Sequence, residues 1–147
     1  GVLTHWFAAD AAPSGVDMLF VDGRAHTGGP LVNAAVISNA APSYAPAGRH
    51  LIQTSALLGP GRPVPTDDDV LRHAADLFSS STAGWELVAR HEVPQALPLQ
   101  PPPLRSQQPM GGPSGLVICG DHRETASING ALVSGHRAAL AILGRPR

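Results

Sequence analysis

One stretch late in the chain decides the fold: Leu116-Val117-Ile118-Cys119-Gly120-Asp121, followed by a short loop and a helix. A short continuous apolar run of this kind is typical of a strand buried on both faces. Ser127 is a favourable N-cap for a helix over residues 128–143, and Gly144 is a favourable residue to end it. A buried strand, a Gly-Asp turn and a helix N-terminus together indicate a binding site for a polar ligand.

The residue types around this turn indicate what such a ligand would offer. An ionised Asp121 only accepts hydrogen bonds, which suits the hydroxyl groups of a sugar or a ribityl chain. The first backbone N–H groups of the helix, at Ile128 and Asn129, would face an electron-rich acceptor with help from the helix dipole. The same pattern also fits an ordinary strand–loop–helix with a surface aspartate and a capping serine, and the pattern alone does not decide between the two.

The stretch resembles a known C-terminal flavin signature, that of the flavin-containing amine oxidase and phytoene-desaturase-like superfamily. The resemblance runs through Cys119-Gly120-Asp121-His122-Arg123-Glu124-Thr125-Ala126-Ser127-Ile128-Asn129-Gly130-Ala131-Leu132 and continues in Ser134-Gly135-His136-Arg137-Ala138-Ala139. It implies that FAD is the cofactor, with Asp121 on the ribityl chain and the N–H groups near Ile128 and Asn129 at the pyrimidine end of the isoalloxazine ring. The cofactor contacts that it implies are Gly120, Asp121, Ser127, Ile128, Asn129 and Ala131. We assign no catalytic acid or base, because positioning and the flavin itself do the work in many flavoenzymes, and we expect no metal, because the histidines show no paired ligand spacing.

The first part of the chain has short strand-like runs separated by turn residues rather than by helices. This spacing predicts antiparallel strands rather than β-α-β units. The expected strands cover residues 4–8, 18–22, 32–38, 50–58 and 85–93. Thr66 followed by three aspartates predicts a helix N-terminus after the fourth strand, because a hydroxyl caps and carboxylates complement the helix dipole.

Residues 94–113 are rich in proline and predict little regular structure. Composition alone leaves open whether they form a linker or an ordered loop over a site; the resemblance favours an ordered crossing between domains. The expected fold is therefore mixed α/β (α+β). Residues 1–107 would form a partial, antiparallel substrate-binding domain with its crossing loop, and residues 108–147 the last strand and helix of a Rossmann-like FAD-binding domain.

Two departures from the family pattern limit the function that we expect. The Gly-x-Gly-x-x-Gly turn that cradles a dinucleotide is absent, and the glycines around Pro60 lack the strand–turn–helix context for it. The chain alone should therefore bind FAD weakly or not at all. Amine oxidases carry an aromatic residue where this chain has Ser127, and the chain contains no lysine to stand near the flavin N5. Both points favour a desaturase or isomerase-like relative with an apolar substrate over a monoamine oxidase.

Composition excludes several other classes of protein. A chain of 147 residues with 43% hydrophobic residues is too apolar to be disordered, and its net charge of -1 creates no field that would hold nucleic acid. No apolar run approaches the roughly 20 residues that cross a bilayer. The start of the chain lacks an initiator Met and is typical of mid-protein sequence. We expect a cytoplasmic location, or the membrane periphery if the substrate is a lipid or carotenoid.

These observations lead to one main hypothesis and two alternatives. The main hypothesis is the C-terminal part of a flavin-dependent oxidoreductase that transfers hydride between a small or apolar substrate and FAD. Its partner would be an upstream FAD-binding segment, in the same gene or a separate chain, and the chain alone should be inactive and self-associate. The first alternative is a non-catalytic truncated module or small subunit that completes another chain's flavin site. The second is a hydrolase that uses Cys119 or Ser127 with His122, for which no nucleophile-elbow motif is present.

Single residues near the motif carry simpler expectations. Cys119 should be a buried structural thiol, because it lies in the apolar run without an evident base. His122 should be a loop histidine near the cofactor. Arg123 and Glu124 should be solvated loop charges. His5 and the neighbouring Trp6 fit packing in the sheet better than the lining of a substrate cavity.

Overall fold

The computed structural model describes residues 1–24 and 28–144. The chain divides into two compact units, Gly1–Ala96 and Leu97–Arg147. The predicted boundary between a substrate-binding part, residues 1–107, and an FAD-binding segment, residues 108–147, stays a prediction. The last three residues of that segment lie outside the described residues.

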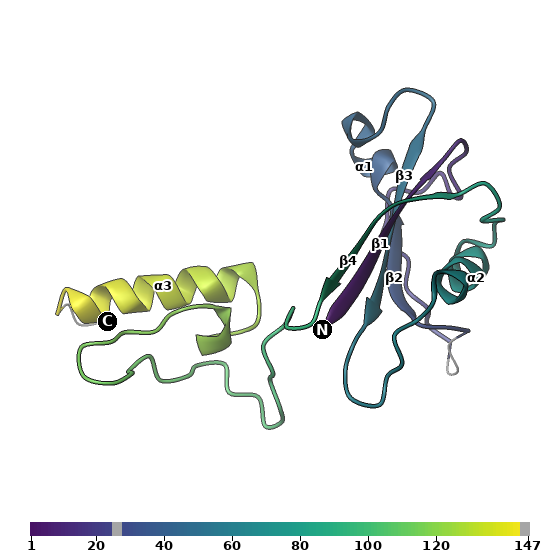
Figure 1. The fold of residues 1–147 in the computed structure, drawn as a ribbon. Helices are drawn as coiled ribbons and strands as arrows, with labels where there is room; N and C mark the ends of the chain where they lie inside the picture. The colour runs from purple at the N-terminus through teal and green to yellow at the C-terminus, as the bar shows by residue number, and fades with distance from the viewer. Residues whose placement is uncertain (25–27, 145–147) are drawn as a thin grey trace. The chain divides into compact units, whose positions relative to one another are not determined.

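The first unit is built on a four-stranded antiparallel sheet with the strand order β2-β3-β1-β4 (Figure 1). Along the central pair, Val2 lies opposite Leu57 and Ala9 lies opposite His50. The strands are β1 (Val2–Ala9), β2 (Leu31–Val36), β3 (His50–Leu57) and β4 (Glu86–Val93). The mixed α/β fold class and the antiparallel pairing are thus confirmed.

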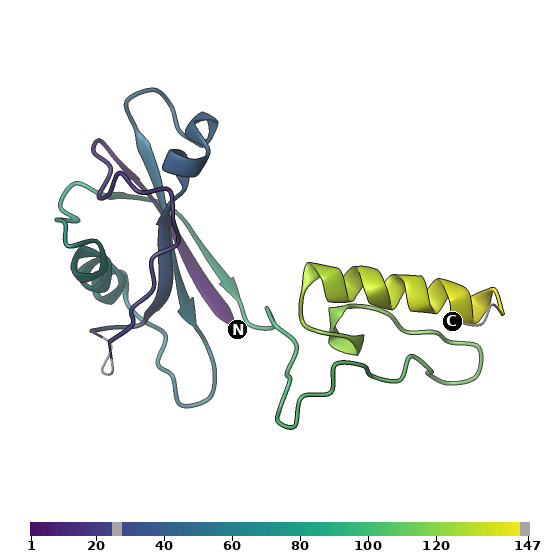
Figure 2. The ribbon, with the colours of Figure 1, turned by 180° about the vertical axis from the view of Figure 1, so that it is seen from behind.

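Two predicted strands differ from the structure. Residues 18–22 form no strand: only Phe20 pairs, through two backbone hydrogen bonds with Ala34 of 2.8 and 3.0 Å. The neighbouring apolar side chains, Met18, Leu19 and Val21, are largely exposed, so this segment has no buried face to fix a longer ladder. The strand predicted over residues 32–38 ends at Val36. The short helix α1 (Ile37–Ala40) follows it directly and lies beside the first residues of β3 (Figure 2).

Helix α2 (Asp67–Phe78) begins where the sequence predicts it, behind a reciprocal cap. The Thr66 hydroxyl accepts a hydrogen bond from the Asp69 N–H at 3.2 Å, and the Asp69 carboxylate accepts one from the Thr66 N–H at 3.1 Å. The hydrogen bonds from the Thr66 hydroxyl and from Arg72 lower the pKa of Asp69 to about 2. This cap satisfies donors that a helix start otherwise leaves free.

The core of the first unit lies between α2 and one face of the sheet. Val70, Ala74 and Phe78 of α2 are buried, as are alternate residues of the strands such as Phe7 and Ile52. Residues on the opposite face of β1, including Trp6, are only half-buried. The period-two burial along β1 and β3 matches a sheet with one face on a core and one face outside it.

A buried polar network joins α2 to β2 and was not predicted. The His73 Nδ1 atom accepts a hydrogen bond from the Leu31 N–H at 2.9 Å, so the proton lies on Nε2, which donates to the Asp22 carboxylate at 3.0 Å. Asp22 also accepts hydrogen bonds from the Arg24 guanidinium at 2.8 and 2.6 Å. These bonds, those from Arg24 foremost, hold the pKa of Asp22 well below its usual range. The network satisfies polar groups that burial would otherwise leave unpaired.

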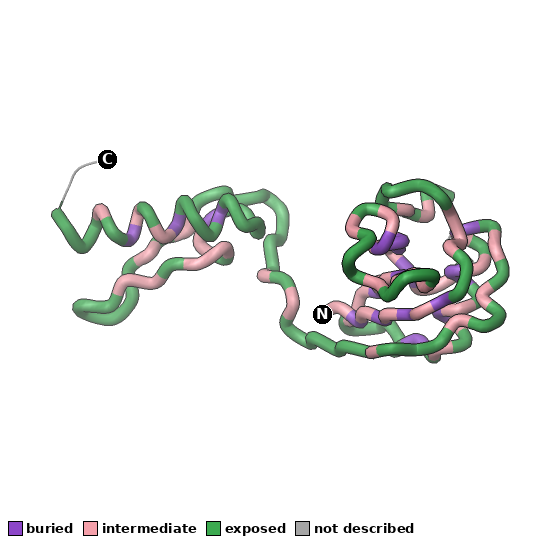
Figure 3. The backbone as a smooth tube through the Cα atoms, turned by 90° about the horizontal axis from the view of Figure 1, so that it is seen from above, coloured by how far each residue is buried: buried purple, intermediate pink, exposed green. Residues whose placement is uncertain are grey.

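The second unit contains the long helix α3 (Ile128–Ile142) and a short 3-10 turn, η2 (Asp121–Arg123). The predicted helix and its cap are confirmed: the Ser127 hydroxyl accepts a hydrogen bond from the Gly130 N–H at 3.0 Å, and Gly144 has the positive φ of a helix terminator. Buried positions recur every fourth residue along α3, at Gly130, Ser134 and Ala138 (Figure 3).

The expected burial of residues 116–119 is wrong. Val117 forms only an isolated bridge with Gly111, the Leu116 side chain is 52% exposed, and Cys119 is exposed rather than a buried thiol. A strand buried on both faces needs a neighbouring strand on each side and cover above and below. Among the described residues, the backbone of this segment pairs only with residues 110–113.

Candidate functional site

The turn that carries Asp121 is held against the middle of α3. Gly120 has φ +144°, a backbone conformation that L side chains rarely adopt, and its N–H donates to the Ser134 Oγ atom at 2.8 Å. A Cβ atom at Gly120 would also lie 2.7 Å from the ring of His122. The glycine is therefore required for the chain to reverse direction here.

The Asp121 carboxylate is available to a ligand. Its side chain is 44% exposed, and Nδ1 of His122 lies 4.0 Å from Oδ1. Within residues 1–24 and 28–144 no donor makes a hydrogen bond to this carboxylate. Its acceptor positions are thus free for hydroxyl groups, and the role of Asp121 in binding stays a prediction.

The N-terminus of α3 offers the complementary donors. The Ser127 hydroxyl accepts the Gly130 N–H and shares a hydrogen bond of 3.1 Å with the Thr125 hydroxyl, while the backbone N–H groups of Ile128 and Asn129 meet no acceptor in the described part of the chain. The Ile128 side chain is 83% exposed, and Ala131, one turn further on, is exposed as well. The first turn of α3 is open to a ligand and carries the positive end of the helix dipole.

The structure separates these donors from Asp121 along the helix. Gly120, which precedes Asp121, contacts Ser134, and Ser134 lies six residues after Ile128, on the order of 9 Å along the helix axis. The acceptor and the donors are therefore offered on different parts of one helix–turn frame. FAD carries hydroxyls on its ribityl chain and acceptors on its isoalloxazine ring, so the chemistry of the residues present fits this cofactor.

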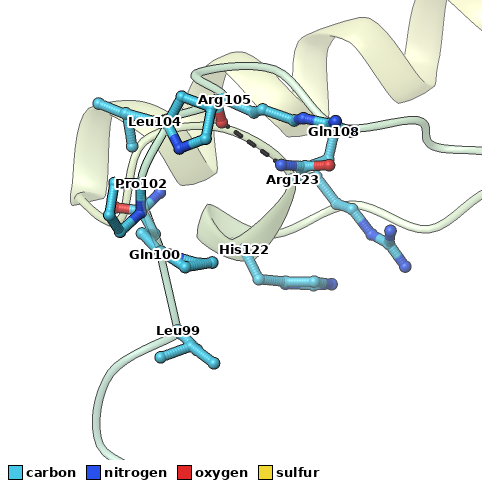
Figure 4. A pocket seen from close by; sticks show the side chains of 10 residues that line it. Leu99, Gln100, Pro102, Leu104, Arg105, Gln108, His122 and Arg123 are labelled. Carbon is cyan, nitrogen blue, oxygen red and sulfur yellow. Dashed lines mark hydrogen bonds between the residues drawn. The ribbon is translucent and has the colours of Figure 1, made fainter.

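The proline-rich segment packs against the same turn. Gln100 Nε2 donates to the Glu124 carbonyl oxygen at 3.0 Å, and the Gln108 N–H donates to that of Arg123 at 2.9 Å. Residues 99–105 enclose, with Gln108, His122 and Arg123, a hollow of about 450 Å³ (Figure 4). The described residues that line it include no carboxylate. This part of the segment is thus an ordered loop over the turn and not a free linker.

The prediction of solvated charges at Arg123 and Glu124 is wrong. Glu124 is only 7% exposed and forms an ion pair with the similarly buried Arg137 of α3. Arg123 is partly buried and donates from Nη1 to the Pro109 carbonyl oxygen at 3.2 Å. The sequence around Glu124 does not reveal this partner, because Arg137 lies 13 residues further along the chain.

The other candidate residues are not gathered at this site. His5 is fully buried in the sheet and bonds to Asp67 at 3.0 Å through Nε2, which confirms its role in packing. Neither Cys119 nor Ser127 makes a hydrogen bond to His122 in the described structure. The described residues also contain no group of three or more His, Cys, Asp or Glu side chains arranged for a metal ion. None of their helices is long and apolar enough to cross a membrane.

The turn at Asp121 and the open N-terminus of α3 form a candidate site for a cofactor, and comparison with known proteins identifies the family. The chain belongs to the flavin-containing amine oxidoreductase family, whose model matches residues 6–143. This confirms the family resemblance and the flavin cofactor.

A solved oxidoreductase from Methanosarcina mazei has a similar fold, with a TM-score of 0.65 at 16% sequence identity. The match covers 98% of this chain and 34% of that one, so this chain spans about a third of the length of its structural neighbour. At this identity the likeness concerns the fold alone. No curated protein matches the chain.

Proposed function

We propose that this chain is the C-terminal part of an FAD-dependent oxidoreductase that moves a hydride between a small or apolar substrate and the flavin. The observation that carries this proposal is the combination, on one helix–turn frame, of a free Asp121 carboxylate with free backbone amides at Ile128 and Asn129. Bound FAD would supply the two-electron redox chemistry. This chain's contribution is to bind and orient: Asp121 accepts hydrogen bonds from hydroxyls, and the amides of Ile128 and Asn129 donate to ring acceptors.

We favour an apolar substrate of the kind that desaturases use. Support comes from Ser127, whose hydroxyl is committed to capping α3 and which stands where amine oxidases carry an aromatic side chain. The absence of lysine from the chain also supports this choice, although a lysine could come from elsewhere in the protein.

The rest of the site would come from an upstream segment that carries the dinucleotide turn. Large apolar side chains of α3 are exposed in this chain, and the exposed fraction is 68% for Leu132 and 72% for Ile142. Contiguous exposed apolar surface of this kind is typical of an interface. The isolated chain should therefore be inactive and self-associate at high concentration. A non-catalytic module that completes the flavin site of another chain is supported by the same surface and the same missing turn.

A flavin titration of three proteins tests the proposal: the chain alone, the chain extended by its upstream segment, and the extended protein with Asp121→Asn. We expect no tight binding by the chain alone, stoichiometric FAD binding by the extended protein, and about tenfold weaker binding after the substitution, because a hydrogen bond to a charged group contributes roughly 1.5 kcal/mol. Asp68→Asn is the matched control, since Asp68 is an exposed carboxylate in the first unit. Tight binding by the chain alone, or no binding by the extended protein, would show that the proposal is wrong.

A further inference from the structure

The turn at Asp121 is fixed at both ends by one face of α3. Ser134 and Arg137 lie three residues apart on the helix and hence on neighbouring positions of one face. The fully buried Ser134 accepts the N–H of Gly120 at 2.8 Å, at the start of the turn. Arg137 donates to the Arg123 carbonyl oxygen at 3.4 Å and pairs with Glu124, at the end of the turn. Ser134 and Arg137 thus each form a hydrogen bond with the residue that lies 14 positions earlier in the chain.

Arg137 also reaches the proline-rich loop, because its second terminal nitrogen donates to the Gln108 carbonyl oxygen at 3.4 Å. One buried side chain therefore joins α3, the turn and the loop. A guanidinium suits this role better than an ammonium, since its planar fork offers several donors in fixed directions. Neither Ser134 nor Arg137 is placed to touch a ligand of the turn: the Ser134 hydroxyl and both terminal nitrogens of Arg137 are hydrogen-bonded to the protein, the Nε of Arg137 is buried without a partner, and both side chains are at least nine-tenths buried.

We infer that Ser134 and Arg137 are positioning residues for the flavin site, which fix how far along α3 the Asp121 carboxylate stands from the amides of Ile128 and Asn129. This inference rests on the proposed function, because it gives a purpose to that spacing. A positioning role differs from general stabilisation in one respect. When the turn is loosened, Asp121 should no longer contribute to FAD affinity, even while α3 stays folded.

A double-mutant cycle in the extended, FAD-binding protein tests the inference. Asp121→Asn should weaken FAD binding about tenfold when Arg137 is present. In an Arg137→Met background it should weaken binding less than about threefold, because the Asp121 carboxylate is no longer held at a fixed position along α3. Arg137→Lys should restore part of this dependence. His136→Gln, an exposed change on the neighbouring position, should leave the tenfold effect intact.

Amide hydrogen exchange in the same variants separates positioning from loss of structure. In Arg137→Met, exchange should accelerate at His122 and Arg123 and stay unchanged at Leu140 in the last turn of α3. Equal effects of Asp121→Asn in both backgrounds would overturn the positioning role and leave the proposed function standing. No effect of Asp121→Asn with Arg137 present would overturn both. Faster exchange along all of α3 would reduce Arg137 to a structural residue and overturn the inference.

Discussion

Two glycines of α3 offer a matched pair of substitutions with opposite expected effects. At Gly130, an added Cβ atom would lie 1.9 Å from the Thr125 carbonyl oxygen, whereas at Gly135 it would meet nothing within 4 Å. Alanine is the better helix former by about 1 kcal/mol at either position. Gly135→Ala should therefore stabilise α3 by up to about 1 kcal/mol.

For Gly130→Ala, the steric cost exceeds this gain. Ordinary contact begins near 3.4 Å, so Thr125 and the residues leading into α3 would have to move by roughly 1.5 Å. Overpacking of this kind costs about 1–3 kcal/mol, and backbone rather than a flexible side chain is in the way, which puts the cost near the upper end. After the gain in helix propensity, we expect a net loss of about 2 kcal/mol.

Amide hydrogen exchange along α3 measures both effects at once. Exchange of the α3 amides should become about 30-fold faster in Gly130→Ala and about fivefold slower in Gly135→Ala, from 1.4 kcal/mol per factor of ten. If the two variants exchange at the same rate, or if Gly130→Ala is the slower one, the close packing of Thr125 against the helix is not a feature of the protein in solution.

Three further predictions concern other parts of the chain. Thr66→Ala should lower the free energy of unfolding by about 1 kcal/mol in urea titrations, because it removes the cap of α2, while Thr66→Ser should lower it much less. Because the pKa of Asp69 is lowered from 3.8 to about 2 in the folded chain, the stability that its ionised form contributes is complete above pH 3.8 and is lost as the pH falls toward 2. The urea midpoint of Asp69→Asn should consequently change less over that range than that of the unmodified chain. Cys119 should react with a thiol reagent in the native chain about as fast as in urea, since it is exposed; protection in the native chain would contradict the structure.

The elements that sequence analysis predicted well are those with strong local signals. Thr66 and Ser127 cap their helices as expected, because a hydroxyl before an apolar periodic segment acts within one turn. The run of β-branched, aromatic and aliphatic residues over residues 4–8 and the sequence alternation over residues 50–58 likewise predict β1 (Val2–Ala9) and β3 (His50–Leu57). At the candidate site, the free carboxylate of Asp121 and the open first turn of α3 follow from the same kind of local reasoning.

The features that sequence analysis missed depend on distant partners. The burial of His73 against Asp22 joins positions 51 residues apart, and no spacing rule connects them. The pairing of Glu124 with Arg137 depends on the turn folding back along α3. The apolar run at residues 116–119 predicts a buried strand only if neighbours cover it, and the pattern of a segment does not reveal whether such neighbours are present.

The two edges of the sheet have a consequence for how the chain behaves among copies of itself. Open strand edges invite another chain to add a strand and so promote aggregation. On the outer side of β2, the backbone of Ala34 is already engaged by Phe20. On the other side, β4 carries Glu86, Arg90, His91 and Glu92, and polar and charged side chains on an edge strand discourage the addition of another strand. Growth of the sheet from chain to chain is disfavoured at both ends, so any self-association should proceed through helix α3 and leave the sheet as it is.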